Sequence, residues 1–306
     1  EGGRAVGVAY LRDGERHEAR ADQVVLCAGA IGSPQLLLLS GIGPADELRA
    51  VGVTPVHDLP GVGRNLQDHI NIPITFAAGE RVGIGGMTAE EINAALRAWD
   101  ATRTGPMTSN WAAAGGFARS RPDVAEPDLQ LYGVISGNRD HARYIAGAPG
   151  VTLHATLQRP SSRGTLRLRS ADPIEYPALD PRYFVGDAGR SDLATMTLGV
   201  RLNRRIAASA PLADVIAHEI TPSADARDDA TIADYIRAHC TTLYHPACTC
   251  RMGTDELAVV DPTLRVRGVE GLRVADASVF PTMVSGNTNA PTIMVAERAA
   301  EFITAA

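Results

Sequence analysis

One stretch, residues 271–302, constrains the fold most, because it places a strand, an irregular loop and a helix in direct succession. Residues 272–275 predict a buried strand, and residues 292–302 keep their charges on one face, as a packed helix does. The loop ends at 287–291 with candidate N-cap residues and a proline near the first helical position. The positive end of a helix is therefore predicted where a polar loop ends, which suits an anion. The alternative is an ordinary capped helix that packs on a sheet.

Composition excludes several classes of function. The chain has 306 residues, is 45% hydrophobic, and is therefore long enough for a large core and two domains. Its net charge of -6 gives no basic face for nucleic acid. All basic side chains apart from histidine are arginine, and the absence of lysine rules out Schiff-base chemistry and a lysine-dependent phosphate loop. The longest uncharged run, 23–45, is broken by glycine and proline, so no membrane span is predicted.

The cysteines are Cys27, Cys240, Cys248 and Cys250. The last three lie near two histidines, so a zinc site is one interpretation. Their spacing does not fit the common closed zinc sites, which favour two to four residues between paired cysteines. Packed, reduced thiols are the other interpretation, and they are typical of a cytoplasmic protein. We therefore expect no metal.

The order of local patterns predicts two domains of different type. Asp13-Gly14 predicts a hairpin turn, and 23–27 a third strand, followed by a glycine turn and a helix capped by Ser33. From residue 70 to 240 the chain changes to short alternating runs typical of an antiparallel sheet. Helical patterns accompany that sheet at 89–102, 190–209 and 230–240. The prediction is an α/β domain formed by 1–69 and 241–306, with an α+β domain inserted at 70–240.

Five ordered motifs carry a family resemblance. They are Gly29-Ala30-Ile31-Gly32-Ser33-Pro34, Pro60-Gly61-Val62-Gly63-Arg64-Asn65-Leu66-Gln67-Asp68-His69, Arg159-Pro160-Ser161-Ser162-Arg163-Gly164, Tyr244-His245-Pro246-Ala247-Cys248-Thr249-Cys250 and Ser285-Gly286-Asn287-Thr288-Asn289-Ala290-Pro291-Thr292. With them the chain resembles the glucose-methanol-choline family of flavin oxidoreductases, most closely its choline dehydrogenase-like branch. The resemblance implies part of a Rossmann-like FAD-binding domain with an inserted substrate domain.

By this resemblance, His245 and Asn287 match the catalytic pair of the family. The resemblance implies oxidation of an alcohol by proton abstraction and hydride transfer to flavin N5. A neutral imidazole can accept the hydroxyl proton near neutral pH, and an asparagine amide can orient the hydroxyl or stabilise the alkoxide. The competing interpretation of His245 is a loop histidine satisfied by backbone groups.

The resemblance also implies flavin contacts from Asp276, Ala277, Asn289, Pro291 and Thr292. The helix that begins near the last three residues offers partial positive charge to the reduced flavin. For Asp276 the alternative is a plain loop cap, and for Asn289 an N-cap.

One departure from the family is large. The Gly-x-Gly-x-x-Gly turn that binds the dinucleotide pyrophosphate in the family is absent from this sequence. We therefore expect the chain to be the C-terminal portion of the enzyme, completed by a separate or missing N-terminal portion. Two alternatives stay open: an acid-base enzyme similar to the hydroxynitrile lyases of the family, with structural FAD, and a non-catalytic fragment. Aromatic residues make up only 5% of the chain, so choline is not favoured over other alcohols.

Overall fold

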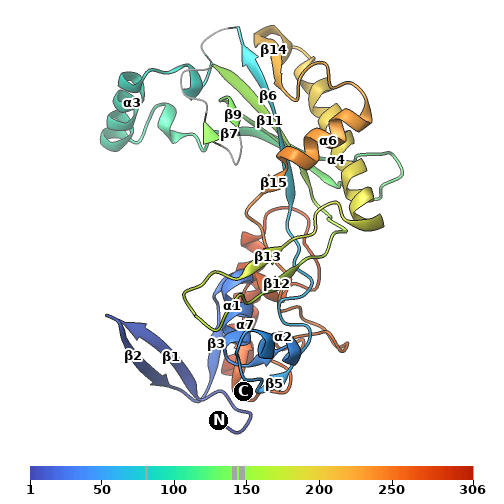
Figure 1. The fold of residues 1–306 in the computed structure, drawn as a ribbon. Coiled ribbons are helices and arrows are strands. Elements are labelled where there is room, and N and C mark those ends of the chain that lie inside the picture. The colour runs from blue at the N-terminus through green and yellow to red at the C-terminus, as the bar shows by residue number, and fades with distance from the viewer. Residues whose placement is uncertain (80–81, 140–142, 145–148, 306) are drawn as a thin grey trace. The chain divides into compact units, whose positions relative to one another are not determined.

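The computed structural model describes residues 1–79, 82–139, 143–144 and 149–305, and it divides the chain into two units (Figure 1). Unit 1 consists of Glu1–Asp68, Ser162–Tyr183 and Tyr244–Ala306. Unit 2 consists of His69–Ser161 and Phe184–Leu243. Helices and both parallel and antiparallel strand pairs are present, so the fold is of mixed α and β type.

Unit 1 begins with the predicted hairpin. Strands β1 (Gly7–Arg12) and β2 (Glu15–Arg20) pair antiparallel, with Arg12 opposite Glu15. Asp13 and Gly14 form the turn with φ values of 54° and 83°. Positive φ at both central residues is what a two-residue hairpin turn requires, and aspartate followed by glycine tolerates it.

The centre of unit 1 is a parallel strand pair flanked by helices. Strand β3 (Val24–Leu26) leads into helix α1 (Gly29–Leu39) and pairs with β16 (Leu272–Val274), which continues through the 3₁₀ turn η3 (Ala277–Val279) to helix α7 (Asn289–Thr304). Unit 1 also contains β4 (Ile42–Gly43), α2 (Ala45–Ala50) and β5 (His57–Asp58), with β4 and β5 parallel. The core between them contains Leu37, Leu38, Val274, Val295 and Ala299.

The predicted domain boundary differs from the structure at residues 162–183. This segment holds the antiparallel pair β12 (Thr165–Arg167) and β13 (Ala178–Asp180) and belongs to unit 1. The backbone amide of Leu166 donates to the carbonyl of Gly63 at 2.7 Å, and the Leu166 side chain is buried in the core of unit 1. An alternating sequence predicts a strand but does not specify which core the strand joins, so the range 70–240 is too wide by this segment.

Unit 2 is built on an antiparallel sheet in the order β14-β6-β11-β8-β7, with β15 also paired to β6. These strands are β6 (Ile70–Ala78), β7 (Ala112–Ala118), β8 (Leu129–Val134), β11 (Gly150–Leu157), β14 (Ile216–Thr221) and β15 (Thr241–Thr242). A further short pair is β9 (Asn138–Arg139) with β10 (Arg143–Tyr144). The helices are α3 (Ala89–Thr102), α4 (Gly186–Ala207), α5 (Leu212–Val215) and α6 (Asp229–His239), and the 3₁₀ turns are η1 (Ile84–Gly86) and η2 (Pro106–Thr108).

Helices α4 and α6 cover one face of this sheet (Figure 1). Gly199 of α4 lies so close to β11 that an added Cβ would meet the Cβ of Ala155 at 2.9 Å, which explains a glycine inside a long helix. Met196 of α4 and Ile232 and Ile236 of α6 are fully buried. Among the described helices, none is long and apolar enough to cross a membrane.

Candidate functional site

His245 lies on a loop whose backbone is held by a buried carboxylate. The amide of His245 donates to Oδ1 of Asp68 at 3.1 Å, and the hydroxyl of Tyr183 donates to Oδ2 of Asp68 at 2.8 Å. Asp68 is only 6% exposed. A buried carboxylate that accepts from a backbone amide and a phenol fixes the conformation of the backbone at His245.

Gln67, which directly precedes Asp68, also holds the loop that leads to Asn287. The backbone of Gln67 exchanges two hydrogen bonds with that of Ala247, at 3.1 and 2.9 Å. Its side-chain carbonyl accepts from the Thr282 hydroxyl at 3.2 Å and from the Met283 amide at 3.0 Å. Gln67 therefore joins the His245 segment to the segment that precedes Asn287. The sequence analysis did not single it out, although a buried polar pair directly before an apolar strand is an unusual signal.

A second set of contacts fastens the His245 segment to α1. Pro34 lies inside α1 and has no backbone N–H, so the carbonyl of Ala30 lacks its usual partner four residues on. The hydroxyl of Thr249 donates to this carbonyl at 2.6 Å. Downstream, the amides of Cys248 and Cys250 donate to the carbonyls of Ala277 and Ser278.

The carboxylate of Asp276 is engaged within the protein. Its Oδ2 accepts from the Gly29 amide at 3.0 Å and from the Ser33 hydroxyl at 2.5 Å, while Oδ1 accepts from the Ser278 amide at 2.8 Å. Asp276 therefore caps η3 and occupies the amino end of α1. The helix begins at Gly29, so the prediction that Ser33 caps it is wrong.

Helix α7 begins earlier than predicted, at Asn289, and its N-cap is Thr288. Asn289 is therefore the first helical residue rather than the cap. Asn287 and Asn289 are exposed, and the Thr292 hydroxyl donates to the carbonyl of Thr288 at 2.7 Å. The side chain of Thr288 makes no cap hydrogen bond, and the first turn holds no acidic residue. The capping side chain of this helix therefore does not neutralise its positive end, whereas the end of α1 receives the carboxylate of Asp276.

Burial disfavours the thiolate form of three of the cysteines. Burial raises the pKa of Cys248 to about 12 and that of Cys240 to about 11, and it also raises the pKa of Cys250. Within the described ranges, no group of three or more His, Cys, Asp or Glu residues is arranged to hold a metal ion.

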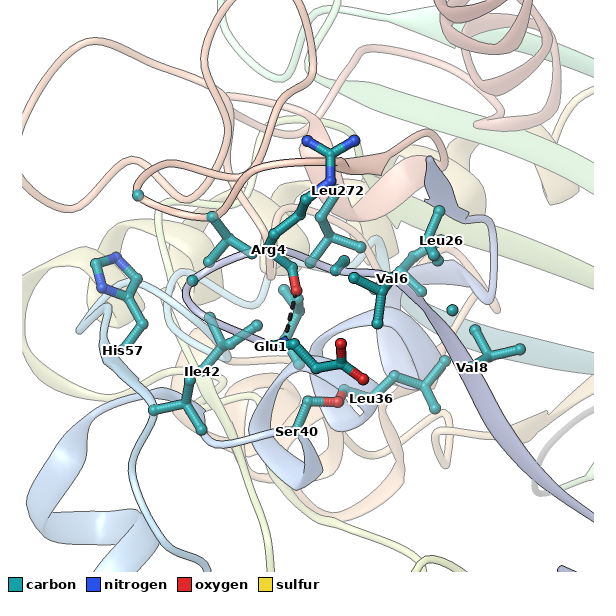
Figure 2. Close-up of a pocket in the computed structure, with 18 of the residues that line it drawn as sticks. Glu1, Arg4, Val6, Val8, Leu26, Leu36, Ser40, Ile42, His57 and Leu272 are labelled. Carbon is teal, nitrogen blue, oxygen red and sulfur yellow. Dashed lines mark hydrogen bonds between the residues drawn. The ribbon is translucent and has the colours of Figure 1, made fainter. Parts of the chain in front are cut away.

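A pocket of about 390 Å³ lies elsewhere in unit 1 and contains none of the predicted site residues. Figure 2 shows its mainly apolar wall, formed by Val6, Val8, Leu26, Leu36, Ile42 and Leu272. The amino group of Glu1 donates to the carbonyl of Arg4 at 2.9 Å beside it. The pocket is therefore a feature of the β3 and α1 surface rather than of the His245 and Asn287 loops.

Comparison with known proteins identifies the family. Two family models described as GMC oxidoreductase match residues 1–71 and 160–296, which together include the loops of His245 and Asn287. The chain belongs to the GMC oxidoreductase family. The resemblance of the five motifs is thereby confirmed at the level of family.

Relatives of this GMC oxidoreductase chain include dehydrogenases. It is 43% identical to an alcohol dehydrogenase [acceptor] of Pseudomonas putida, over 98% of this chain and 55% of that protein. It is also 43% identical to the mitochondrial choline dehydrogenase of Homo sapiens, over 99% of this chain and 51% of that protein. The chain spans about half the length of these relatives.

Solved structures of oxidases share the fold. Pyridoxine 4-oxidase from Mesorbium loti superposes with a TM-score of 0.85 at 28% identity, over 98% of this chain and 55% of that one. A formate oxidase superposes with a TM-score of 0.91 at 27% identity, over 99% of this chain and 57% of that one. FAD modification occurs in the formate oxidase of Aspergillus oryzae RIB40.

The residues of this GMC oxidoreductase chain fit one part of an FAD site. The amino end of α7, whose first turn holds no acidic residue, offers positive character for an anionic edge of a flavin ring. The amino end of α1, by contrast, is already occupied by the carboxylate of Asp276. The described residues therefore suit the ring of a flavin better than its pyrophosphate.

Proposed function

We propose that this chain is the C-terminal portion of an FAD-dependent enzyme that oxidises an alcohol to an aldehyde or ketone. The observation that carries the proposal is the anchoring of the His245 loop and the segment before Asn287 by one residue, Gln67. Family membership supplies the chemistry that these anchored loops are suited to perform. Bound FAD supplies the oxidant, which accepts the hydride at N5.

His245 and Asn287 act on the substrate hydroxyl. The imidazole of His245 accepts the hydroxyl proton, and the amide of Asn287 donates to the oxygen as negative charge develops there. Because Asp68 fixes the backbone at His245, no backbone entropy need be lost there when the imidazole engages the hydroxyl. The role of the protein is therefore to hold the proton acceptor and the hydrogen-bond donor in place before the substrate arrives.

Unit 1 supplies part of a Rossmann-like FAD-binding domain in this proposal. The parallel pair of β3 and β16, each followed by a helix or a 3₁₀ turn, is the arrangement that supports it. Asp276 and Ala277 contribute backbone groups next to η3, because the Asp276 carboxylate is already engaged. The flavin ring takes its remaining contacts from Asn289, Pro291 and Thr292 at the start of α7.

Unit 2 supplies the substrate-binding domain. Its range is the predicted 70–240 without residues 162–183, which belong to unit 1. A separate or missing N-terminal portion of the enzyme supplies the glycine motif that binds the dinucleotide. The apolar pocket beside β3 and α1 is the surface it covers, which accords with a chain that spans about half of its relatives. A cytoplasmic location accompanies the proposal, since the cysteines are free thiols.

Anaerobic flavin reduction tests this function. In the flavin-containing enzyme, we expect His245→Ala to slow reduction by alcohol about 100-fold to 10,000-fold, the usual contribution of a general base. The control His218→Ala changes an exposed histidine of unit 2 and leaves the rate unaltered. An unchanged rate in His245→Ala would rule out the proton-accepting role. Flavin that no alcohol bleaches would favour the lyase or the non-catalytic alternative.

A further inference from the structure

A cavity of about 340 Å³ lies in unit 2 at the carboxyl end of α4. Its lining comes from the last turn of α4, from strands β6 and β14, and from the loop at 222–228 that connects β14 to α6. All of these segments belong to unit 2. The cavity therefore shares no residue with the His245 and Asn287 loops of unit 1, and the proposed function leaves it without a role.

The floor of this cavity is apolar. Phe76 of β6 and Ile216 of β14 lie on one side of the sheet, because Ile216 pairs with Ala78, two residues beyond Phe76. Ala207 of α4 and Ala224 of the loop extend the apolar lining. Such a surface suits the apolar part of a ligand, since ligand sites are mostly apolar with a few polar groups that fix orientation.

One wall of the cavity is an ion pair whose charges are already balanced. Nε and Nη2 of Arg204 donate to Oε2 and Oε1 of Glu219 at 3.0 and 2.7 Å. The two side chains are only 21% and 11% exposed, so this two-pronged pair is a fixed part of the wall. Nη1 of Arg204 also donates to the carbonyl of Ala226 at 2.7 Å, which holds the loop against α4.

Arg227, on the same loop, lines the cavity as a cation without a carboxylate. Its Nε donates to the carbonyl of Ala224 at 3.3 Å, and in the described part of the chain its two terminal nitrogens find no acceptor. The backbone here is held, because the carbonyl of Arg227 accepts from Nη2 of Arg201 at 3.1 Å. Arg201 in turn has the carboxylate of Asp229 as its partner. Unpaired arginines are ordinary on a protein surface, but this one lies on a held loop beside an apolar floor.

These charges restrict what the cavity recognises. A guanidinium with free terminal nitrogens matches the two oxygens of a carboxylate. A dicarboxylate or a phosphate dianion would be better matched by a second unpaired cation, and the described lining residues include none. An organic cation would meet Arg227 without a free carboxylate to balance it, since Glu219 is engaged by Arg204. The volume lies near the lower end of the range of about 300 to 1,000 Å³ for ligand pockets, so the ligand is small.

We propose that this cavity of unit 2 binds a small monocarboxylate. The carboxylate lies on the terminal nitrogens of Arg227, and the apolar body covers the floor that Phe76, Ile216 and Ala207 form. Such a ligand contacts the end of α4, strand β14 and the loop at once, so it stabilises their folded arrangement. The proposal is independent of the proposed function and does not require that the enzyme oxidise an alcohol.

Binding is tested by NMR on the whole protein with ¹³C-labelled isoleucine methyl groups. Hexanoate is the probe, hexanamide has the same body without the charge, and acetate has the charge without the body. Ile216→Val identifies the Ile216 signal by its disappearance. We expect hexanoate to shift this signal to saturation at concentrations at which hexanamide and acetate leave it in place. A signal that hexanoate does not move, or that hexanamide or acetate moves equally, would overturn the proposal.

The role of Arg227 is tested by substitution at this exposed position. Arg227→Gln should weaken hexanoate binding about 10-fold, the effect of losing a charged hydrogen bond at an exposed site. Arg227→Lys keeps the charge but not the two-pronged geometry, so it should recover only part of the affinity. Arg205→Gln is the matched control, because Arg205 is an exposed arginine of α4 that does not line the cavity. Equal affinities of Arg227→Gln and Arg205→Gln for hexanoate would show that Arg227 does not bind the carboxylate. Flavin reduction plays no part in either measurement, so a failure of the proposed function leaves both results decisive.

Discussion

His154 illustrates how a single buried residue affects the whole stability profile. Its folded-state pKa is about 3, whereas a histidine in an unfolded chain has a pKa near about 6.5. At pH values between these two pKa values, His154 binds a proton in the unfolded state but not in the folded state. The free energy of unfolding therefore decreases as pH falls through this window, by about 1.4 kcal/mol per pH unit in its middle from this residue alone.

The free energy of unfolding of the His154→Gln variant should consequently depend less on pH in the acid range. This variant keeps an amide donor but has no group that titrates in the window. We expect its urea midpoint to fall less steeply than that of the wild type between about pH 6 and pH 4, and His218→Gln to follow the wild type. Parallel curves for all three proteins would show that His154 is accessible to protons in the folded state.

At the level of elements, Asp276 connects the end of β16 to the start of α1. Asp276→Ala would leave the Gly29 amide, the Ser33 hydroxyl and the Ser278 amide without their acceptor. Since hydrogen bonds to a buried charge are worth about 1.5 to 3 kcal/mol each and partly recover in water, we expect a loss of stability on the order of 3 kcal/mol. Denaturant unfolding measures it.

Asp276→Asn provides the comparison, because it keeps one acceptor oxygen. It should be destabilised less than Asp276→Ala. If both variants unfold at the same denaturant concentration as the wild type, the carboxylate makes no net contribution to the free energy of unfolding. Its three donors then find other partners at no cost.

These elements also show what local sequence can predict. The Asp13-Gly14 hairpin and helix α3 follow from neighbouring residues alone: the turn needs two positive φ values, and Thr88 with Glu91 forms a capping box. The start of α1, by contrast, cannot be predicted from neighbouring residues. Ser33 and Pro34 look like an N-cap and a first helical residue, yet the helix continues through them. The amide at the true amino end, Gly29, donates to the carboxylate of Asp276. The hydroxyl of Thr249 donates to the carbonyl of Ala30, which has no helical partner because Pro34 lacks an N–H. Asp276 and Thr249 are each more than 200 residues away in sequence from these partners.

In the candidate site, too, contacts between residues distant in sequence could not be predicted from local sequence. Motifs and the family resemblance that they carry predict His245 and Asn287 as the catalytic pair, and that role stays a prediction. Gln67 and Asp68, which hold the backbones of the two loops, lie far from both in sequence, and only the folded chain reveals their partners. Motifs therefore predict the reacting groups, while long-range contacts determine what positions them.

For the whole molecule, the pocket beside β3 and α1 bears on assembly. A parallel pair of only two strands is marginal alone, and large apolar residues such as Val8 and Leu36 remain 45% and 44% exposed there. The part of the Pseudomonas putida alcohol dehydrogenase that this chain does not match serves as a partner probe. We expect coexpression to yield a one-to-one complex that retains FAD.

Leu36→Glu should weaken that complex at least about 10-fold, because it places a charge against an apolar contact. Ile174→Glu is the control, since Ile174 is 73% exposed in the same unit and does not line the pocket. Equal affinities for the two variants, measured by calorimetry, would show that the partner does not cover this surface.

Asp68 has one more consequence, which concerns how such proteins diversify. It is the last residue of the first segment of unit 1, Tyr183 is the last residue of the second, and His245 lies next to the start of the third. The Asp68 carboxylate thus joins both points at which the chain leaves unit 1 and the second of the two points at which it re-enters. Insertions or wholesale exchange of the sequence between these points need not disturb the His245 backbone. The sequence between these points can therefore change while the backbone conformation at His245 is kept.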